Sequence, residues 1–462
     1  MTTNVLSKYT SASVKEAFIL TTPIFFSLLS SNLMLFCDRY FLSRYSFEAF
    51  SSVGVANYLV ILFQITCIWF ASINQVFIGR SLGDGSRQKI GQYTWQMIWA
   101  SLLTSFFIIP LGTVAGKLYF ANTEVNGLGD AYFSIMLLGN FLFPLGTTLA
   151  SFQLGLGRTK VLPLVAFVAN FLNVILDYYL INGISGIFIP LGVKGAAIAT
   201  LVSQGIYCVI LFFLFISSRN EKEYKTKDFS FRASIFKECV KVGSLGAFSR
   251  SVSLFFWMLS INIVARKGSD YVTIILFGST ICILTSIINE SVSKGLITFY
   301  SYFLGQGNWN YVWKSLRSGI ILLFMAFLLL AFPFLFYNQY LIELVVGSKI
   351  DIYMKNYLTL SCYWLWFFFL LEGIAFSCTS LVVAMKETAY LAKVVIPLTF
   401  LSSYLPYYFL FNVWSFGPDK IWMVAWLCFI IMPSTHIFKI VRSYRKSQKS
   451  LLKRENHLFI GG

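Results

Sequence analysis

The run VLPLVAFVANFLNVILDYYLI, Val161 to Ile181, is apolar over about the thickness of a bilayer and yet carries Asn173 and Asp177. Residues four apart on a helix lie on one face, one turn above the other. A carboxylate in hydrocarbon is costly, so such a residue almost always faces a protein interior or a wet cavity. With the amide oxygen of the asparagine, the pair could hold a proton or a small hard cation. The alternative is a buried polar pair that only joins helices.

The composition places the whole chain in a membrane. Of its 462 residues, 57% are hydrophobic and only 12% are charged, whereas soluble domains are about one quarter charged. The first apolar run lacks a small-residue cleavage site and is followed by many similar runs, which predicts a retained span rather than a signal peptide. The eight cysteines show no C-x-x-C pairing, so we expect neither a disulfide framework nor a metal site built on them.

Apolar runs long enough to span a bilayer recur twelve times. They lie near residues 17–41, 53–78, 95–115, 131–155, 161–182, 195–217, 243–265, 272–303, 315–336, 357–384, 389–412 and 421–441.

The positive charges predict the orientation of these spans. Most of the 36 lysines and arginines lie in the two tails and in every second loop, which predicts that both termini are cytoplasmic and that the chain lies in the cell (inner) membrane. The carboxy-terminal tail carries Arg442, Arg445, Lys446, Lys449, Lys453 and Arg454. We interpret this tail as a topology anchor near anionic lipid and expect no nucleic-acid partner, despite the net charge of +17.

A polar and then amphipathic stretch divides the chain nearly in half. The predicted domains are an amino-terminal lobe of six spans over residues 1–218, a cytoplasmic linker along the membrane surface over 219–241, and a carboxy-terminal lobe with the basic tail over 242–462.

Two pairs of similar segments relate the halves. SLGDGSRQKIGQ begins at Ser81, and the similar FLGQGNWNYVWK begins at Phe303. GRTKVLPLVAFVANF begins at Gly157, and KETAYLAKVVIPLTF begins at Lys386. Six spans per half give both halves the same orientation, so the expected fold is an all-α polytopic membrane protein of twelve transmembrane helices, in two six-helix lobes related by a parallel pseudo-two-fold repeat. This is a transporter architecture.

The repeat is broken at the polar pair. In the register that aligns Gly157 with Lys386, Asn173 corresponds to Ser402 and Asp177 to Pro406. The pair is therefore present in the amino-terminal half alone. Simple helix packing has less reason to be confined to one half, so this asymmetry favours a functional site.

Two further acids in apolar runs have simple candidate partners. Asp38 lies near the outer end of the first run, where it belongs either to the site or to an interfacial ion pair with Arg39. Glu290 lies one helical turn before Lys294, which predicts an internal salt bridge.

A third acid, Glu372, lies within WLWFFFLLEGIAF, close to Trp364 and Trp366. A carboxylate among aromatic faces suits an amphipathic cation, through charge pairing and cation–π contact. The alternative is a carboxyl group kept protonated by burial. In the first run, Pro23 must remove one backbone hydrogen bond, which gives that helix a ready bend.

The motifs together resemble those of the multidrug and toxic-compound extrusion (MATE) family. They are the paired LGDG and LGQG turns, the GRTK and MKET entries to the fifth and eleventh spans, and N-x-x-x-D followed by LGVKGAAIAT, Leu191 to Thr200. The resemblance covers about residues 15 to 441. Each motif is loose by itself, but their order and spacing are specific.

The resemblance implies an outward pump with two six-helix lobes, driven by Na⁺ or H⁺ antiport, with a bend at Pro23. Its cation site, which would also be the metal site if sodium is the coupling ion, would comprise Asp38, Asn173, Asp177 and Thr200. The expected substrate-binding residues are Glu372, Trp364, Trp366 and Tyr178. Where one branch of the family carries a glutamate in the seventh span, this chain has Ser253, which resembles the DinF branch.

The sequence therefore predicts an antiporter that exports amphipathic, cationic drugs or toxic compounds, works as a monomer in the bilayer and needs no cofactor besides H⁺ or Na⁺. The alternative is a flippase for lipid-linked saccharides or their precursors, which would need a strongly cationic interior beyond Arg250 and Lys294. An enzyme would need a clustered His, Cys or Ser–base constellation, and the sequence shows none.

Overall fold

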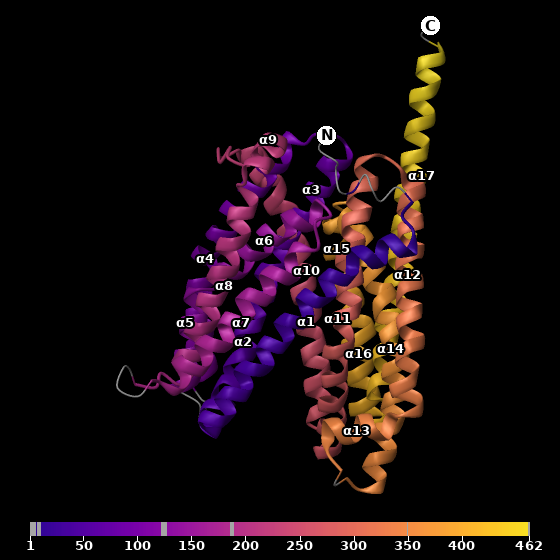
Figure 1. Cartoon of the computed structure of the whole chain (residues 1–462). Helices are drawn as coiled ribbons and strands as arrows, with labels where there is room; N and C mark the ends of the chain where they lie inside the picture. The colour runs from indigo at the N-terminus through magenta and orange to yellow at the C-terminus, as the bar shows by residue number, and fades with distance from the viewer. Residues whose placement is uncertain (1–5, 7–10, 122–126, 185–188, 349, 461–462) are drawn as a thin grey trace. The chain divides into compact units, whose positions relative to one another are not determined.

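The computed structural model describes residues 6, 11–121, 127–184, 189–348 and 350–460 of an all-helical protein (Figure 1). The chain divides into two compact units. Unit 1 comprises Met1–Thr10 and Ile19–Ser251, and unit 2 comprises Ser11–Phe18 and Val252–Gly462.

Unit 1 is a bundle in which α7 lies along α8, and α2 packs against both α5 and α6. Its helices are α1 (Val14–Tyr45), α2 (Phe47–Ser72), α3 (Asn74–Gly83), α4 (Gln88–Phe120), α5 (Leu128–Leu138), α6 (Leu142–Gly155), α7 (Val161–Asn182), α8 (Val193–Phe215), α9 (Ser218–Tyr224) and the first half of α10 (Ala233–Ala265).

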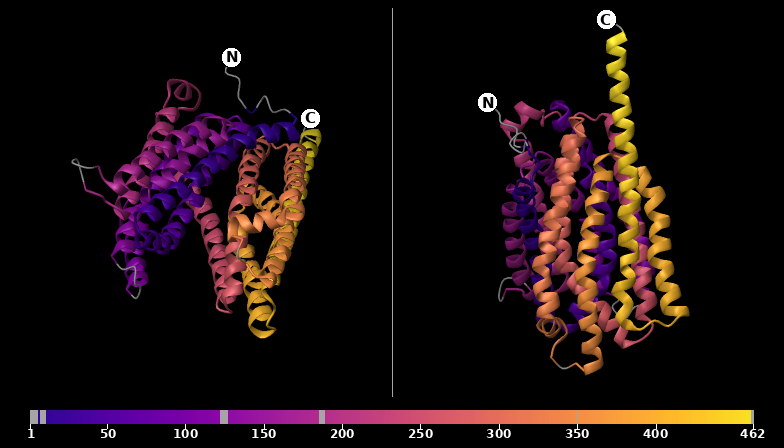
Figure 2. Two further views of the ribbon diagram at one scale, coloured as in Figure 1. Left: turned by 60° about the horizontal axis from the view of Figure 1, so that its bottom comes forward. Right: turned by 90° about the vertical axis from the view of Figure 1, so that its right-hand side faces the viewer.

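Unit 2 is built around α14, which packs against α11, α12 and α17 and has 67% of its most apolar segment buried. The four helices run side by side in Figure 2. The elements of unit 2 after α10 are α11 (Ser269–Gly305), α12 (Trp309–Ala331), η2 (Phe332–Phe336), α13 (Asn338–Val346), α14 (Ile352–Ala384), α15 (Thr388–Thr399), η3 (Phe400–Tyr404), α16 (Leu405–Tyr407), η4 (Tyr408–Val413), η5 (Pro418–Lys420) and α17 (Ile421–Ile460).

The structure confirms the predicted number of spans. In the described part of the chain, eleven helices are long and apolar enough to cross a membrane, and the pair α5 and α6, bent by 44°, makes twelve when it is counted as one span. The pair corresponds to the run predicted at residues 131–155. Its break lies between Leu138 and Leu142, where Gly139 closely approaches Leu201 of α8.

The sequence repeat reappears in the backbone of the turns. Gly85 and Gly307, which correspond in the first pair of similar segments, both have positive φ, at 81° and 71°. In the second pair, Gly157 has φ 71° and Lys386 has φ 61°. Each of the latter two turns is closed by the same pair of backbone hydrogen bonds. The amide of Gly157 or Lys386 donates one, and the amide of the residue that follows it donates the other. The second half therefore keeps a left-handed turn even where lysine replaces glycine.

The eleventh span is much less regular than α7, its counterpart in the repeat. It contains Pro397 and Pro406, and it continues from α15 through two π-helical segments separated by the short α16. Proline supplies no backbone N–H and crowds the preceding turn, so the helix rearranges its hydrogen bonds around these positions. This difference in backbone accompanies the loss of the polar pair.

The stretch predicted as a surface linker, residues 219–241, is anchored to unit 1. The indole N–H of Trp95 on α4 donates a 2.7 Å hydrogen bond to the Thr226 carbonyl, and the Gln96 amide donates one of 2.9 Å to the Ser230 carbonyl. The stretch contains α9 and the start of α10, and the division between the two units falls within α10, after Ser251.

Candidate cation and substrate site

One face of α7 is buried along its whole length. Ala166, Ala169, Asn173, Asp177 and Ile181 follow one another at helical spacing, and all five are buried. The Asn173 and Asp177 side chains are 0% exposed, on the same face of the helix, as the sequence pattern predicts. Gly183, at φ 76°, then ends the helix.

The polar atoms on this face, together with one on α1, have no hydrogen-bond partner among the described residues. They are both carboxyl oxygens of Asp177, both amide atoms of Asn173 and Oδ1 of Asp38. Each unsatisfied buried polar group costs about 1–3 kcal/mol. Apolar side chains could join the helices at a lower cost in free energy. This cluster is therefore better suited to binding a proton or a cation than to joining helices.

Asp38 belongs to this cluster rather than to the interfacial pair that the sequence left open. Its side chain on α1 is 8% exposed, and its carboxyl group lies within interaction range of that of Asp177. Arg39 is exposed, and among the described residues no ion pair joins it to Asp38. The structure therefore brings together two carboxyl groups from the first and the fifth predicted spans.

Two further contacts hold α1 against α7 on either side of the cluster. Asn170 donates a 2.8 Å hydrogen bond from Nδ2 to Oγ of Ser30. The ring of Tyr178 packs edge-on against Phe41, with centroids 6.1 Å apart, although Tyr178 is still 55% exposed. The sequence analysis overlooked Asn170, which the spacing N-x-x-N-x-x-x-D before Asp177 could have indicated.

Thr200 lies on α8, the helix packed along α7. Its side chain is 7% exposed, and its hydroxyl donates a 3.0 Å hydrogen bond to the Ala196 carbonyl, which leaves its oxygen able to accept or to coordinate. No hydrogen bond between Thr200 and Asp177 is recorded in the described part of the chain. The helices meet closely at Gly195, where an added Cβ would lie 2.5 Å from the Leu180 carbonyl oxygen.

A further residue near the aspartates was not predicted. Tyr132 on α5 is buried and lies within electrostatic range of both Asp38 and Asp177. Only the packing of α5 against α8 and α2 brings it there, so no pattern in the sequence pointed to it.

The bend predicted at Pro23 is not visible as a break. Helix α1 continues through Pro23 from Val14 to Tyr45. The proline still supplies no N–H to the helix, so its role as a hinge stays a prediction.

In unit 2, Glu372 is 8% exposed and is held by a neighbour that the sequence analysis missed. Nδ2 of Asn289 on α11 donates hydrogen bonds to Glu372 Oε2, at 2.9 Å, and to the Phe369 carbonyl, at 3.0 Å. Oδ1 of Asn289 is buried without a described partner. An acid and an amide thus lie together in this unit as well, but on different helices.

The two tryptophans expected around Glu372 make ring contacts with other helices. Trp366 stacks on Phe327 of α12, at 4.1 Å between ring centroids and 10° between planes, and its N–H donates to the Phe327 carbonyl at 2.9 Å. Trp364 packs edge-on against Trp426 of α17, at 5.0 Å. The step from Trp366 to Glu372 corresponds to about 240° of rotation about the helix axis, which turns Trp366 toward α12 and Glu372 toward α11.

The other residues that the sequence singled out inside the spans each contact a different kind of neighbour. Lys294 forms the predicted salt bridge with Glu290, at 2.8 Å, which confirms that prediction. The guanidinium of Arg250 lies 5.1 Å from the ring centroid of Trp69. Ser253, at the position that suggested the DinF branch, has its hydroxyl 3.2 Å from that of Thr399.

Within the described residues, no cluster of three or more histidine, cysteine, aspartate or glutamate side chains could hold a metal ion. The four residues predicted to bind a cation offer carboxylate, amide and hydroxyl oxygens, which are hard donors. Their chemistry fits a proton or an alkali cation in transit.

The comparisons with known proteins agree with this architecture. The MatE family model matches residues 23–179. Over 312 residues, 67% of each chain, the sequence is 27% identical to the probable multidrug resistance protein NorM of Thermotoga maritima. By these matches the chain is similar to MatE family proteins. The proteins that it matches are membrane transporters and not enzymes.

Solved structures match nearly the whole chain. An outward-facing multidrug resistance MATE family transporter of the MOP superfamily has a TM-score of 0.83 at 19% identity, covering 96% of this chain and 99% of that chain. A MOP superfamily transporter from Pyrococcus furiosus, whose binding pocket is described as having reverse polarity, also has a TM-score of 0.83, at 18% identity, covering 97% and 99%. At these identities the likeness establishes the fold alone.

Proposed function

We propose that this protein is a MatE-like antiporter that exports amphipathic, cationic compounds in exchange for H⁺ or Na⁺. The observation that carries the proposal is the buried group of Asp38, Asn173 and Asp177, in which five buried polar atoms have no hydrogen-bond partner among the described residues. Two adjoining carboxyl groups in a low-dielectric interior cannot both stay ionised unless they share a proton or bind a cation. Whether the site is occupied therefore depends on the ion concentration on the side of the membrane that the site faces.

Coupling requires that occupancy alters the helices that carry the site. A shared proton or cation between Asp38 and Asp177 would draw α1 toward α7, around the existing contact of Asn170 with Ser30. Pro23 would let the preceding part of α1 bend as this happens. The transporter could then expose its substrate alternately to the two sides of the membrane.

We further propose that Glu372 supplies the charge that selects cationic substrates. Trp364, Trp366 and Tyr178 stay proposed as substrate contacts; of these, Tyr178 is 55% exposed and beside the cation site. The DinF branch, a monomeric state, the cell (inner) membrane and cytoplasmic termini belong to the same proposal, with the charge distribution as support for the orientation.

The test is efflux of a cationic dye from proteoliposomes under separately imposed Na⁺ and H⁺ gradients. Asp177→Asn removes one charge isosterically and should abolish gradient-driven efflux. Asp270→Asn, an exposed acid at the start of α11, is the matched control and should transport as wild type. Gradient-driven efflux by Asp177→Asn at the wild-type rate would reject the site.

The flippase alternative receives less support. It needs a cluster of cations in the membrane interior, and one of its two candidates, Lys294, is neutralised by Glu290. Translocation of a lipid-linked saccharide by the same proteoliposomes, with no efflux of the cationic dye, would favour it over the antiporter.

A further inference from the structure

The last helix changes from apolar to basic along a single face. Helix α17 continues past the ends of the other helices of unit 2 (Figure 1). Ile431, Phe438, Arg442, Arg445 and Lys449 follow at intervals of seven, four, three and four positions, which places them on one stripe of the helix.

The apolar half of this stripe borders a groove between α15 and α17, with a volume of about 550 Å³. The groove is lined by Tyr390, Val394, Ile430, Ile431, Ser434, Thr435 and Phe438. Ile431 and Phe438 are 40% and 71% exposed. Its position along a transmembrane helix and its mainly apolar lining suit an acyl chain.

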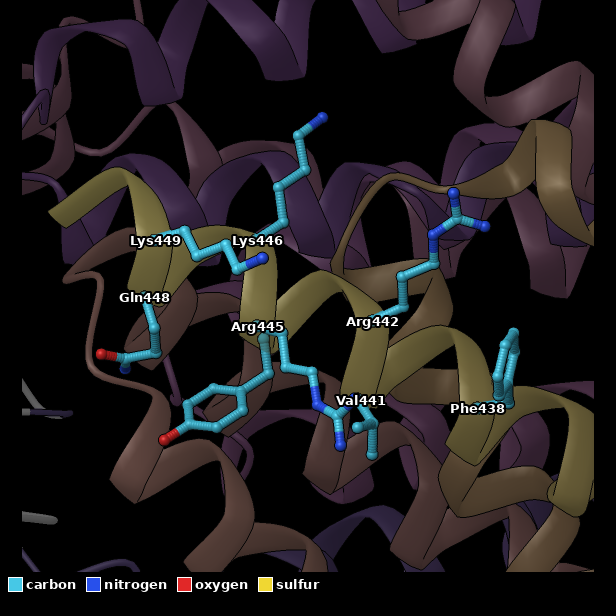
Figure 3. A pocket seen from close by; sticks show the side chains of 8 residues that line it. Phe438, Val441, Arg442, Arg445, Lys446, Gln448 and Lys449 are labelled. Carbon is cyan, nitrogen blue, oxygen red and sulfur yellow. The ribbon is translucent and has the colours of Figure 1, made fainter. Parts of the chain in front are cut away.

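The basic half borders a second hollow, of about 780 Å³, and Phe438 lines both hollows. Its lining residues are Phe438, Val441, Arg442, Tyr444, Arg445, Lys446, Gln448 and Lys449. Figure 3 shows the basic side chains extending from successive turns of α17 beyond Phe438.

These charges are not compensated within the part of the chain whose side chains are described. Arg442, Arg445, Lys446 and Lys449 are exposed, and no ion pair is recorded for them there. The sequence has no acid between Asp419 and Glu455.

Lys439, one turn before this group, is different. Its Nζ lies 3.1 Å from a carboxyl oxygen of Glu387 and 5.4 Å from the ring centroid of Tyr390. The uncompensated charge therefore begins where the apolar groove ends.

The basic turns are also held in place. Tyr444 packs against two tryptophans of α12, with ring centroids 5.7 Å from Trp309 and 6.3 Å from Trp313. A site on this part of α17 thus has a fixed position relative to the groove, unlike a freely moving basic tail.

We propose that this surface binds one anionic phospholipid of the surrounding bilayer, with an acyl chain in the α15–α17 groove and its phosphate between Arg442 and Arg445. Arginine donates paired hydrogen bonds to phosphate oxygens, and basic side chains at a membrane surface attract anionic headgroups. Lys446 and Lys449 lie next along the helix and add to the attraction. The site is separate from the Asp38–Asp177 cluster and does not depend on antiport.

The test measures the thermal stability of the purified full-length chain in neutral detergent with added phosphatidylglycerol or phosphatidylcholine, and lipid retention by native mass spectrometry. Phosphatidylglycerol should raise Tm more than phosphatidylcholine. The double variant Arg442→Gln, Arg445→Gln should lose most of this difference. The double variant Lys237→Gln, Lys241→Gln removes the same charge from exposed positions four apart on α10. It should retain the full difference in Tm between the two lipids.

A separate variant tests the groove. Val394→Trp fills it without changing any charge and should reduce retention of phosphatidylglycerol, whereas glycerol 3-phosphate should stabilise no variant. An unchanged lipid difference in the arginine variant, an equal loss in the α10 control, or full lipid retention by Val394→Trp would overturn the site. Equal stabilisation by glycerol 3-phosphate or by a short DNA duplex would show a general anion surface instead and would overturn it as well.

Discussion

Asn289 on α11 and Glu372 on α14 are joined by a 2.9 Å hydrogen bond from the amide Nδ2 to the carboxyl Oε2. The contact is buried, and the same amide nitrogen also donates to the Phe369 carbonyl, so the orientation of Asn289 is fixed. An acid held in this way has a defined direction, which is what the recognition of a cationic substrate requires. It also raises the question of whether this acid takes part in ion coupling.

The two units should divide these tasks. Glu372→Gln should change which compounds are exported, with cationic ones lost most, and should leave cation binding intact because the Asp38–Asp177 cluster is unchanged. Asp177→Asn should abolish cation binding. Calorimetry or cation-dependent thermal shift without substrate distinguishes the two variants. Loss of cation binding in Glu372→Gln to the same extent as in Asp177→Asn would mean that Glu372 belongs to the coupling machinery.

The hydrogen bond between Asn170 and Ser30 should affect coupling because it joins α1 to α7 about one turn from Asn173. Asn170→Ala should cost about 1 kcal/mol of stability and raise the Na⁺ or H⁺ concentration needed for half-maximal efflux. Ser30→Ala should have a similar effect, and the double variant should be no worse than either single one if the contact is the cause. Strictly additive losses in a double-mutant cycle would contradict this.

Close packing at Gly195 sets the separation of α7 and α8. Gly195→Ala places a methyl group against the Leu180 carbonyl, so the helices must shift, at a cost of about 1–3 kcal/mol. We expect a lower Tm and weaker cation binding. Gly205 on the same helix, where an added Cβ meets nothing within 4 Å, provides the control Gly205→Ala. Equal behaviour of the two variants would argue against the close approach.

The paired turns at Gly157 and Lys386 should respond oppositely to substitution. Gly157→Ala forces a side chain into a left-handed residue and against Leu6, and should destabilise by at least about 1–2 kcal/mol. Lys386→Gly relieves a left-handed non-glycine residue and should leave Tm unchanged or raised. The measurement is thermal unfolding in detergent, and a marked loss of Tm in Lys386→Gly would show that its side chain outweighs the backbone strain.

The two glycine-containing turns test the topology and the repeat together. Single cysteines replacing Asp84 or Gln306, next to Gly85 and Gly307, should react only with reagents that reach the cytoplasm, because six spans separate the turns. A membrane-impermeant maleimide on intact and on opened cells makes the distinction, in a background where the native cysteines are replaced. Labelling of either turn from outside in intact cells would refute the proposed orientation.

The pattern of residues along the chain was sufficient to predict the twelve spans, the repeat and the polar pair on α7. Hydrophobic runs of bilayer length leave little choice of structure, because the backbone must satisfy its own hydrogen bonds in lipid. The fixed spacing of Asn173 and Asp177 on one helix likewise settles their common face, whatever surrounds them. The bond between Glu290 and Lys294 followed from the same rule, since it lies within one helix.

Contacts between helices became visible only in the folded chain. The approach of Asp38 to Asp177, and the positions of Tyr132, Asn170 and Asn289, depend on which helix faces are turned toward each other. The sequence places Glu372 near two tryptophans, but rotation about the helix axis directs these residues to different neighbours. Proximity along a helix is fixed by its geometry, whereas proximity between helices depends on the packing of the whole bundle.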